Sequence, residues 1–350
     1  MGTLSEAYRN DPLPIRHIIP IDFHSLKSVP ESHVWPQSDD HLPSRVPKPE
    51  EEHRLIPIVD LLDPNVVGHV ARACETWGMF QVTNHGVRLS LLEDIELEAR
   101  RLFSLPATEK MKVLRSPEGA TGYGAARIAP FFPKSMWYEG FTIMGSSVDD
   151  HARALWPDDY KRFSDVMEEY QKEMKALAHR LLLLILKTLS VSDEEIRRWA
   201  VDVQGSAADA LQLNSYPACP EPSRAIGLAP HTDSMLLTIL HQSAAPDGLQ
   251  VLHGAGWVAV PPVAGALTVN VGDLLHIFSN GKLPTAYHRA MVSQTHHRIS
   301  VAYFYGPRPD SAVAPFLGPR DVPIYRSVTV GEYIGIKAKH LRRALSLIRI

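Results

Sequence analysis

Two histidines and one aspartate in the second half of the chain could bind a metal ion. His231 and Asp233 lie two residues apart, and His288 follows further along. Residues two apart in an extended backbone point to the same side, so His231 and Asp233 can reach one ion from a single strand or strand end. Two imidazoles and one carboxylate leave three positions of an octahedral metal open, which suits non-heme Fe(II). Zinc with a bound water is the alternative.

A second pair of candidate residues, Arg298 and Ser300, lies in the apolar run 298–304, which reads as a strand. Alternation places Arg298, Ser300 and Ala302 on one face of this strand. A guanidinium can hold a carboxylate by two parallel hydrogen bonds, and the serine can add a third. The sequence therefore predicts a carboxylate clamp, and the alternative is an edge-strand arginine in a surface ion pair.

These residues resemble the signature of the Fe(II)- and 2-oxoglutarate-dependent dioxygenases, which is His-x-Asp, a distant His, and Arg-x-Ser shortly after it. The matching residues are His231, Asp233, His288, Arg298 and Ser300. The resemblance implies that the first three bind Fe(II), and that the last two bind the far carboxylate of 2-oxoglutarate. Asp233 and Arg298 would then be the catalytic residues. It further implies O2 as a substrate, succinate and CO2 as products, and ascorbate as a supporting reductant.

The expected strand 211–216 carries a polar face. Gln212, Asn214 and Tyr216 point to one side of it, opposite the apolar leucines. The dioxygenase family has a pattern close to Asn-x-Tyr-Pro-x-Cys-Pro, and residues 214–220 match it. The resemblance implies that Tyr216 contacts the 2-oxoglutarate carboxylate and that Asn214 belongs to the same site.

The segment 122–142 indicates which branch of the dioxygenase family the sequence resembles. It is similar to the corresponding stretch of plant gibberellin 3-oxidases, and so are residues 211–214, 231–234, 269–273 and 344–348. The resemblance implies 3β-hydroxylation of a gibberellin precursor to the active hormone. The alternative is a related plant dioxygenase that oxidises a gibberellin at another carbon, or a flavonoid.

The segment 121–142 also supplies candidate substrate-binding residues, because aromatic walls, glycines and a cation suit a rigid apolar acid. The candidate walls are Tyr123, Phe131, Phe132 and Trp137, and the candidate cations are Arg127 and Lys134. The sequence does not choose between the two cations. In the alternative interpretation, the aromatic residues pack a buried loop and both cations are solvated surface charges.

Composition indicates an ordinary globular protein. The chain has 350 residues, 45% of them hydrophobic and 21% charged, with a formal net charge of -3. No basic cluster indicates nucleic acid or a membrane surface, so a small molecule is the expected partner. Two cysteines, Cys74 and Cys219, are too few for a disulfide framework, which predicts free thiols in a reducing compartment.

The sequence shows no targeting or membrane-spanning segment. Residues 1–6 lack an apolar signal core, and the longest apolar run, 181–186, is far shorter than the roughly 20 residues of a membrane span. We therefore expect a soluble cytosolic monomer.

Hydrophobic periodicity predicts an α+β fold, in which a jelly-roll (double-stranded β-helix) core is packed by N-terminal helices and a C-terminal helix. The predicted parts are an extended arm 1–53, flexible near 37–53, a helical region 54–205, a catalytic core 206–308 and a C-terminal helical segment 309–350. The predicted helices before residue 206 are 66–77, 91–105, 163–189 and a short one capped by Ser192 and Glu195. The predicted core strands are 211–216, 236–240, 249–252, 257–260, 267–271, 274–278 and 298–304. We expect His85, which lies in a turn, to have a structural role. The alternative is that it is a fourth metal ligand.

Two other classes of protein remain as alternatives to a dioxygenase. A ligand-binding jelly roll without catalysis would be expected to lack part of the five-residue signature. A zinc hydrolase would need a base beside a metal-bound water and has no use for a carboxylate clamp.

Overall fold

Two facing β-sheets form the core of the protein. The computed structural model describes residues 21–23, 25–36, 55–116, 119–145, 148–189, 191–192, 194–196, 209–243 and 248–350. The larger sheet has the order β1-β2-β10-β7-β12-β5-β4-β3, and the smaller has the order β6-β11-β8-β9. The larger sheet comprises Ile58–Asp60, Met79–Thr83, Leu267–Val271, Leu237–Gln242, Arg298–Tyr305, Ala210–Tyr216, Glu139–Met144 and Gly122–Gly124, in that order. The smaller sheet comprises Leu228–His231, His288–Ala290, Leu249–His253 and Gly256–Ala259, in that order. The predicted jelly-roll core is confirmed.

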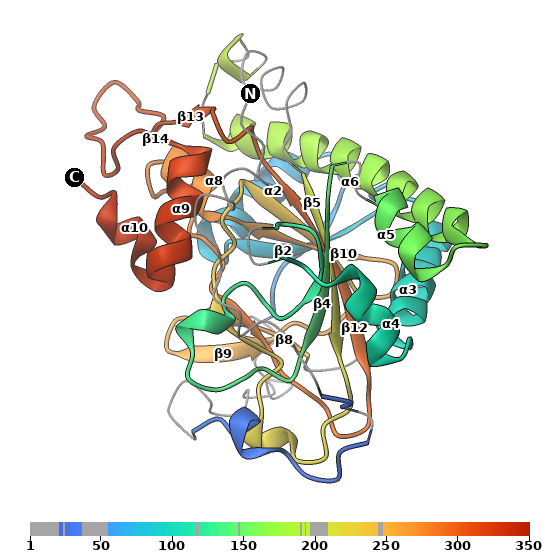
Figure 1. Cartoon of the computed structure of the whole chain (residues 1–350). Helices are drawn as coiled ribbons and strands as arrows, with labels where there is room; N and C mark the ends of the chain where they lie inside the picture. The colour runs from blue at the N-terminus through green and yellow to red at the C-terminus, as the bar shows by residue number, and fades with distance from the viewer. Residues whose placement is uncertain are drawn as a thin grey trace.

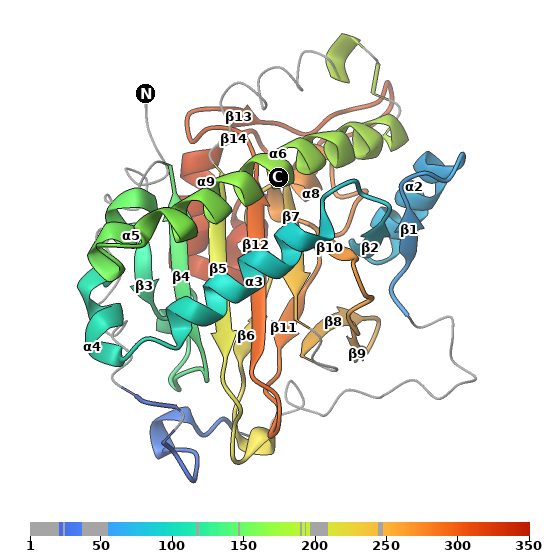
Figure 2. The ribbon, with the colours of Figure 1, turned by 90° about the vertical axis from the view of Figure 1, so that its right-hand side faces the viewer.

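Helices cover the outer face of the larger sheet. Figure 2 shows α3 (Leu89–Phe103) and α6 (Tyr160–Thr188) crossing this face, while α2 (Val66–Thr76) lies near its β1 edge. The α6 residues that repeat at helical spacing, from Phe163 to Ile185, are buried in the main hydrophobic cluster. The predicted helices are confirmed, and so is the capping box, since Ser192 and Glu195 exchange backbone-to-side-chain hydrogen bonds of 3.3 Å.

One predicted strand is wrong. Residues 274–278 belong to a short helix, α8 (Asp273–Phe278), and not to the sheet. Leu274, Leu275, Ile277 and Phe278 are all buried and His276 is the one polar residue of the run, so no polar period separates a helix from a strand here. Gly272 precedes the helix, and a Cβ at this position would overlap the backbone oxygen of Met235.

The described part of the N-terminal arm and the C-terminal helices pack against the rest of the protein through buried side chains. Phe23, Val29 and Trp35 of the N-terminal arm are buried, as predicted for an arm laid over a core, whereas the predicted flexibility near 37–53 falls outside the described residues. The predicted C-terminal helices are α9 (Val330–His340) and α10 (Ala344–Leu347), shown in red in Figure 1. Among the described residues, no helix is long and apolar enough to span a bilayer. Cys74 and Cys219 are free and buried, as expected.

Candidate active site

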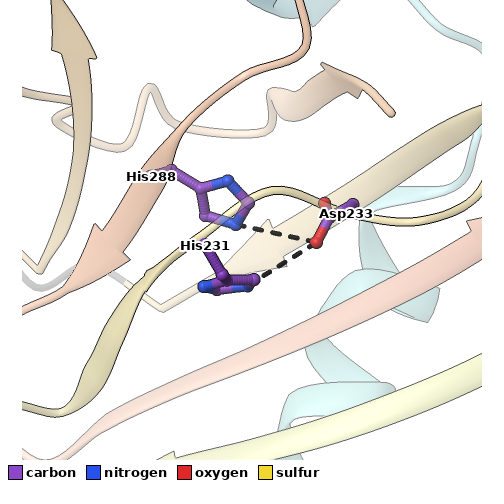
Figure 3. Close-up of side chains that lie close together, drawn as sticks. All are labelled: His231, Asp233 and His288. Atoms are coloured by element: carbon purple, nitrogen blue, oxygen red, sulfur yellow. Dashed lines mark ion pairs between the residues drawn. The ribbon is translucent and has the colours of Figure 1, made fainter. Parts of the chain in front are cut away.

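The three predicted metal ligands meet on the smaller sheet and the turn that follows β6. His231 ends β6, Asp233 lies two residues later, and His288 begins β11, where it pairs directly with His231. The Nε2 atoms of His231 and His288 lie 3.6 Å and 3.8 Å from Oδ1 of Asp233, as Figure 3 shows. One ligand atom from each residue lies within 4.8 Å of the others. Antiparallel pairing thus brings together ligands that are far apart in the sequence.

Backbone carbonyls orient both imidazoles. Nδ1 of His231 lies 2.9 Å from the carbonyl oxygen of Ala229, and Nδ1 of His288 lies 3.0 Å from that of Ala286. A carbonyl can only accept a hydrogen bond, so each Nδ1 carries a proton, and each Nε2 faces Asp233, where it can present its lone pair to a cation. Burial, reinforced by the neighbouring His288 ring, lowers the pKa of His231 to about 4. His231 is therefore neutral at physiological pH, the state that binds metal.

The carboxylate of Asp233 is also prepared for a cation. It is buried, which opposes ionisation, but the imidazoles of His288 and His231 hold its pKa below the ordinary value. Asn270 Nδ2 donates to Oδ2 at 3.3 Å, which leaves Oδ1 facing the histidines. Two imidazole nitrogens and one carboxylate, with no thiolate in the group, fit Fe(II) better than a structural zinc site.

A second buried carboxylate, Asp273, connects the metal-binding segment to α9. Its side chain is 1% exposed and accepts four hydrogen bonds. The donors are the hydroxyls of Thr232 at 3.2 Å, Thr285 at 2.9 Å and Tyr333 at 2.7 Å, and the ammonium of Lys337. Lys337 also donates to Thr232 at 2.5 Å. Since Thr232 lies between His231 and Asp233, this cluster fixes two of the ligands relative to the C-terminal helix.

The residues of the predicted carboxylate clamp lie together on the larger sheet. In the β5–β12 register, Arg298 is opposite Tyr216 and Ser300 is opposite Asn214, so the four predicted residues form a compact patch. All four are at least nine-tenths buried, with exposures of 2–6%. Cation–π contact places the guanidinium 4.9 Å from the Tyr216 ring centroid.

Arg298 carries hydrogen-bonding capacity that its neighbours do not use. Its Nη2 donates to Gln242 at 2.9 Å, but among the described residues its buried Nε has no hydrogen-bond partner. Gly248 makes room for the side chain, because a Cβ there would overlap Cδ of Arg298. A buried guanidinium with an unused N–H is costly without an anion. This arrangement fits a carboxylate ligand such as 2-oxoglutarate.

One cavity joins the metal ligands, the clamp and part of the 121–142 segment. Of the predicted substrate residues, Arg127 and Phe131 line it, whereas Tyr123, Phe132, Lys134 and Trp137 are not among the lining residues. The Tyr123 hydroxyl donates to Glu139 at 2.5 Å, and Trp137 Nε1 donates to the carbonyl of Pro217 at 3.1 Å.

The remaining two predicted substrate residues contact the N-terminal arm. Phe132 packs against Trp35, with ring centroids 5.4 Å apart, and Lys134 forms a 2.9 Å ion pair with Glu31. His85 is structural, as predicted: its Nε2 lies 2.8 Å from the carbonyl oxygen of Gly265, and it is not part of the metal group.

Several cavity residues were not identified from the sequence. The helix α9 contributes Ile334, Lys337 and Ala338, whose spacing is that of one helical face, and Leu341 follows directly after the helix. The sequence shows this helical spacing, but it does not show that this face of the helix points toward the candidate metal site. Tyr138 and Thr142 also line the cavity, from β4 and the residue before it. They share a face of the strand, and the alternation of residues 138, 140 and 142 could have indicated this.

Comparison with known proteins identifies the family. The family model described as "2OG-Fe(II) oxygenase superfamily" matches residues 207–307. The family model described as "non-haem dioxygenase in morphine synthesis N-terminal" matches residues 56–159. Gibberellin 3-beta-dioxygenase 1 of Pisum sativum is 51% identical over 363 residues, covering 100% of this chain and 94% of the relative. The chain belongs to the 2OG-Fe(II) oxygenase superfamily. Gibberellin 3-beta-dioxygenase 1 of Arabidopsis thaliana is 48% identical over 99% of this chain and 98% of its own length.

Solved structures support the assignment of this chain to the oxygenase superfamily. JOX2, solved in complex with 2OG, Fe and JA, is 27% identical, with a TM-score of 0.79 over 93% of this chain and 95% of that one. A rice dioxygenase for auxin oxidation, at 24% identity and a TM-score of 0.69, covers 84% of this chain and 100% of that one, and shows the shared fold. As an oxygenase of this superfamily, the protein uses Fe(II), 2-oxoglutarate and O2 with a small-molecule substrate.

Proposed function

We propose that the protein hydroxylates a gibberellin precursor at the 3β position in an Fe(II)- and 2-oxoglutarate-dependent reaction. The observation that carries this proposal is similarity over the full length: relatives named gibberellin 3-beta-dioxygenase are 41–51% identical to this chain. The five signature residues and a cavity that joins them support the same conclusion.

Different residues of the site are proposed to bind the metal and the cosubstrate. We propose that His231, Asp233 and His288 hold Fe(II), and that Arg298 and Ser300, with Tyr216 and Asn214, hold 2-oxoglutarate by its far carboxylate. Bound together, Fe(II), 2-oxoglutarate and O2 supply the oxidising chemistry that replaces a C–H bond with C–OH and releases succinate and CO2. The protein contributes position: the carbonyl-oriented imidazoles fix the metal, and the buried guanidinium fixes one end of the cosubstrate.

The proposed substrate is a rigid, largely apolar acid, and the cavity wall matches it. Ile128, Phe131, Met144, Phe304 and Ile334 supply apolar surface. Of the two cations in the 121–142 segment, Arg127 lines the cavity, and Lys134 is paired with Glu31 outside it. We therefore propose that Arg127 binds the substrate carboxylate, by the bidentate geometry that a guanidinium allows.

Replacing Arg127 with methionine tests this assignment. The change keeps apolar volume and removes the charge, so the KM for the gibberellin acid should rise by about tenfold or more, the cost of one charge-assisted hydrogen bond. The KM for 2-oxoglutarate should stay within about twofold, because the clamp is a separate patch. The measurement is steady-state kinetics with each substrate varied in turn.

Lys134→Met is the matched control, since it removes a cation from the same segment but from outside the cavity. It should leave both KM values nearly unchanged. Equal effects of the two substitutions, or normal use of the free acid by Arg127→Met, would show that the carboxylate is recognised elsewhere.

A product assay tests the proposed function itself. The enzyme is incubated with Fe(II), ascorbate, 2-oxoglutarate and a panel of gibberellin precursors, and the product is identified by mass spectrometry against standards hydroxylated at each carbon. We expect one added oxygen at the 3β position and one succinate per product. Hydroxylation at another carbon, or turnover of flavonoids with no gibberellin product, would support the corresponding alternative and contradict the proposal.

A further inference from the structure

The buried Arg115 and five side chains that line the cavity form one continuous hydrogen-bonded chain that ends at Ser300. Every link donates in the same direction. The links are Arg115 Nη1 to Thr142 Oγ1 at 3.4 Å, Thr142 Oγ1 to Gln212 Oε1 at 2.6 Å, Gln212 Nε2 to Tyr138 Oη at 3.1 Å, Tyr138 Oη to Asn214 Oδ1 at 2.7 Å, and Asn214 Nδ2 to Ser300 Oγ at 3.3 Å. A cation begins the chain, and the Ser300 hydroxyl ends it.

The last link determines what Ser300 can do. Since its oxygen accepts a hydrogen bond from Asn214, Ser300 keeps its own proton to donate, either to the neighbouring Tyr216 hydroxyl or to a ligand. A hydroxyl that donates to a carboxylate adds a charge-assisted hydrogen bond, whereas one whose lone pairs face the carboxylate repels it. The direction of the whole chain therefore suits a serine that binds an anion.

Tyr138 sets this direction. Its hydroxyl donates to Oδ1 of Asn214, which turns the amide nitrogen toward Ser300. Without that donor, the amide could rotate and present Oδ1 to Ser300 as an acceptor, which would draw the serine proton away from a ligand. Burial raises the pKa of the Tyr138 phenol, so the phenol keeps its proton at neutral pH.

The backbone of β4 provides space for the Tyr138 side chain. A Cβ at Gly140 would overlap the Tyr138 hydroxyl and would lie 2.7 Å from Nε2 of Gln212. The phenol therefore lies over a glycine, at the point where the chain passes from Gln212 to Asn214. This gives a second position at which the chain can be broken without substituting Tyr138 itself.

We infer that Tyr138 is a positioning residue for the cosubstrate, acting through Asn214 to aim the Ser300 hydroxyl at the far carboxylate of 2-oxoglutarate. The inference rests on the proposed role of Ser300 in 2-oxoglutarate binding. Tyr138 also lines the cavity that contains both the clamp residue Ser300 and the proposed substrate-binding residue Arg127.

A double-mutant cycle tests the inference. The affinity of the Fe(II)-loaded enzyme for 2-oxoglutarate is measured by calorimetry without oxygen, for wild type, Tyr138→Phe, Ser300→Ala and the double variant. Tyr138→Phe should weaken binding about threefold to tenfold, the contribution of one net hydrogen bond. In the Ser300→Ala background the same change should cost less than about twofold, because the group it orients is gone. Gly140→Ala, which displaces the hydroxyl by overlap, should reproduce the loss.

Tyr170→Phe is the matched control, because Tyr170 is a fully buried tyrosine in α6 whose hydroxyl has no hydrogen-bond partner among the described residues. It should leave 2-oxoglutarate affinity unchanged. Thermal unfolding of each variant checks folding, and Gly140→Ala takes the place of Tyr138→Phe if the latter does not fold. Equal losses from Tyr138→Phe with and without Ser300, or no loss at all, would overturn the inference. Unchanged affinity in Ser300→Ala would instead overturn the proposed clamp.

Discussion

Asp233→Ala is expected to lower the affinity of the protein for Fe(II) by more than about 100-fold and to abolish both succinate release and hydroxylation. Substitutions of residues behind a metal ligand already cost about 10- to 100-fold in affinity, and Asp233 is the single carboxylate of the group. Removing it also leaves two neutral imidazoles, which supply no negative charge to balance the cation. Calorimetric titration with Fe(II) under anaerobic conditions, or with Mn(II) in air, measures the change.

The control for this variant is Asp310→Ala. Asp310 is a half-exposed aspartate that pairs with Arg308 at 2.9 Å, and neither residue lines the cavity. It should bind metal as the wild type does. Iron at normal occupancy in Asp233→Ala, together with normal turnover, would disprove the assignment of this residue as a ligand.

Arg298→Lys is expected to weaken the apparent affinity for 2-oxoglutarate by about ten- to a hundredfold, because a charge-assisted hydrogen bond contributes about 1.5 to 3 kcal/mol. Lysine keeps the charge but loses the planar fork, and it cannot place a donor where the unpartnered Nε of Arg298 lies. The contact with the Tyr216 ring changes as well. Metal affinity should be preserved, since the substitution leaves all three ligands in place.

Arg308→Lys provides the comparison, as an arginine in an ion pair outside the cavity. Its 2-oxoglutarate dependence should match that of the wild type. If Arg298→Lys shows the same dependence as this control, the far carboxylate is bound by other residues.

The candidate metal-binding residues and the candidate clamp residues lie together in the structure, and the sequence could indicate this partly because their spacing follows from strand geometry. Residues two apart on one strand share a face. Arg298 and Ser300, and likewise Asn214 and Tyr216, could therefore be placed on a common face before the pairing of the two strands was known. The β5–β12 register then brings the two pairs together.

Prediction failed where periodicity carries no information. The run 274–278 has a single polar residue, His276, so no polar period could distinguish its helical form from a strand. In the 121–142 segment, composition could not separate residues that face the cavity from those that face the N-terminal arm. Lys134 and Phe132 contact the arm, while Arg127 faces the cavity, and this difference depends on long-range packing.

The attachment of Asp273 to Tyr333 and Lys337 has a consequence for how the enzyme is made. All three metal ligands precede α9 in the chain, yet the cluster that fixes Thr232 between two of them takes two of its four donors from that helix. During translation, a ribosome that has just added His288, the last of the ligands, has therefore not yet produced the helix that holds them in position. Premature termination between residues 308 and 330 would yield a polypeptide with the full metal signature and an incompletely supported binding segment. We expect such products to acquire iron poorly.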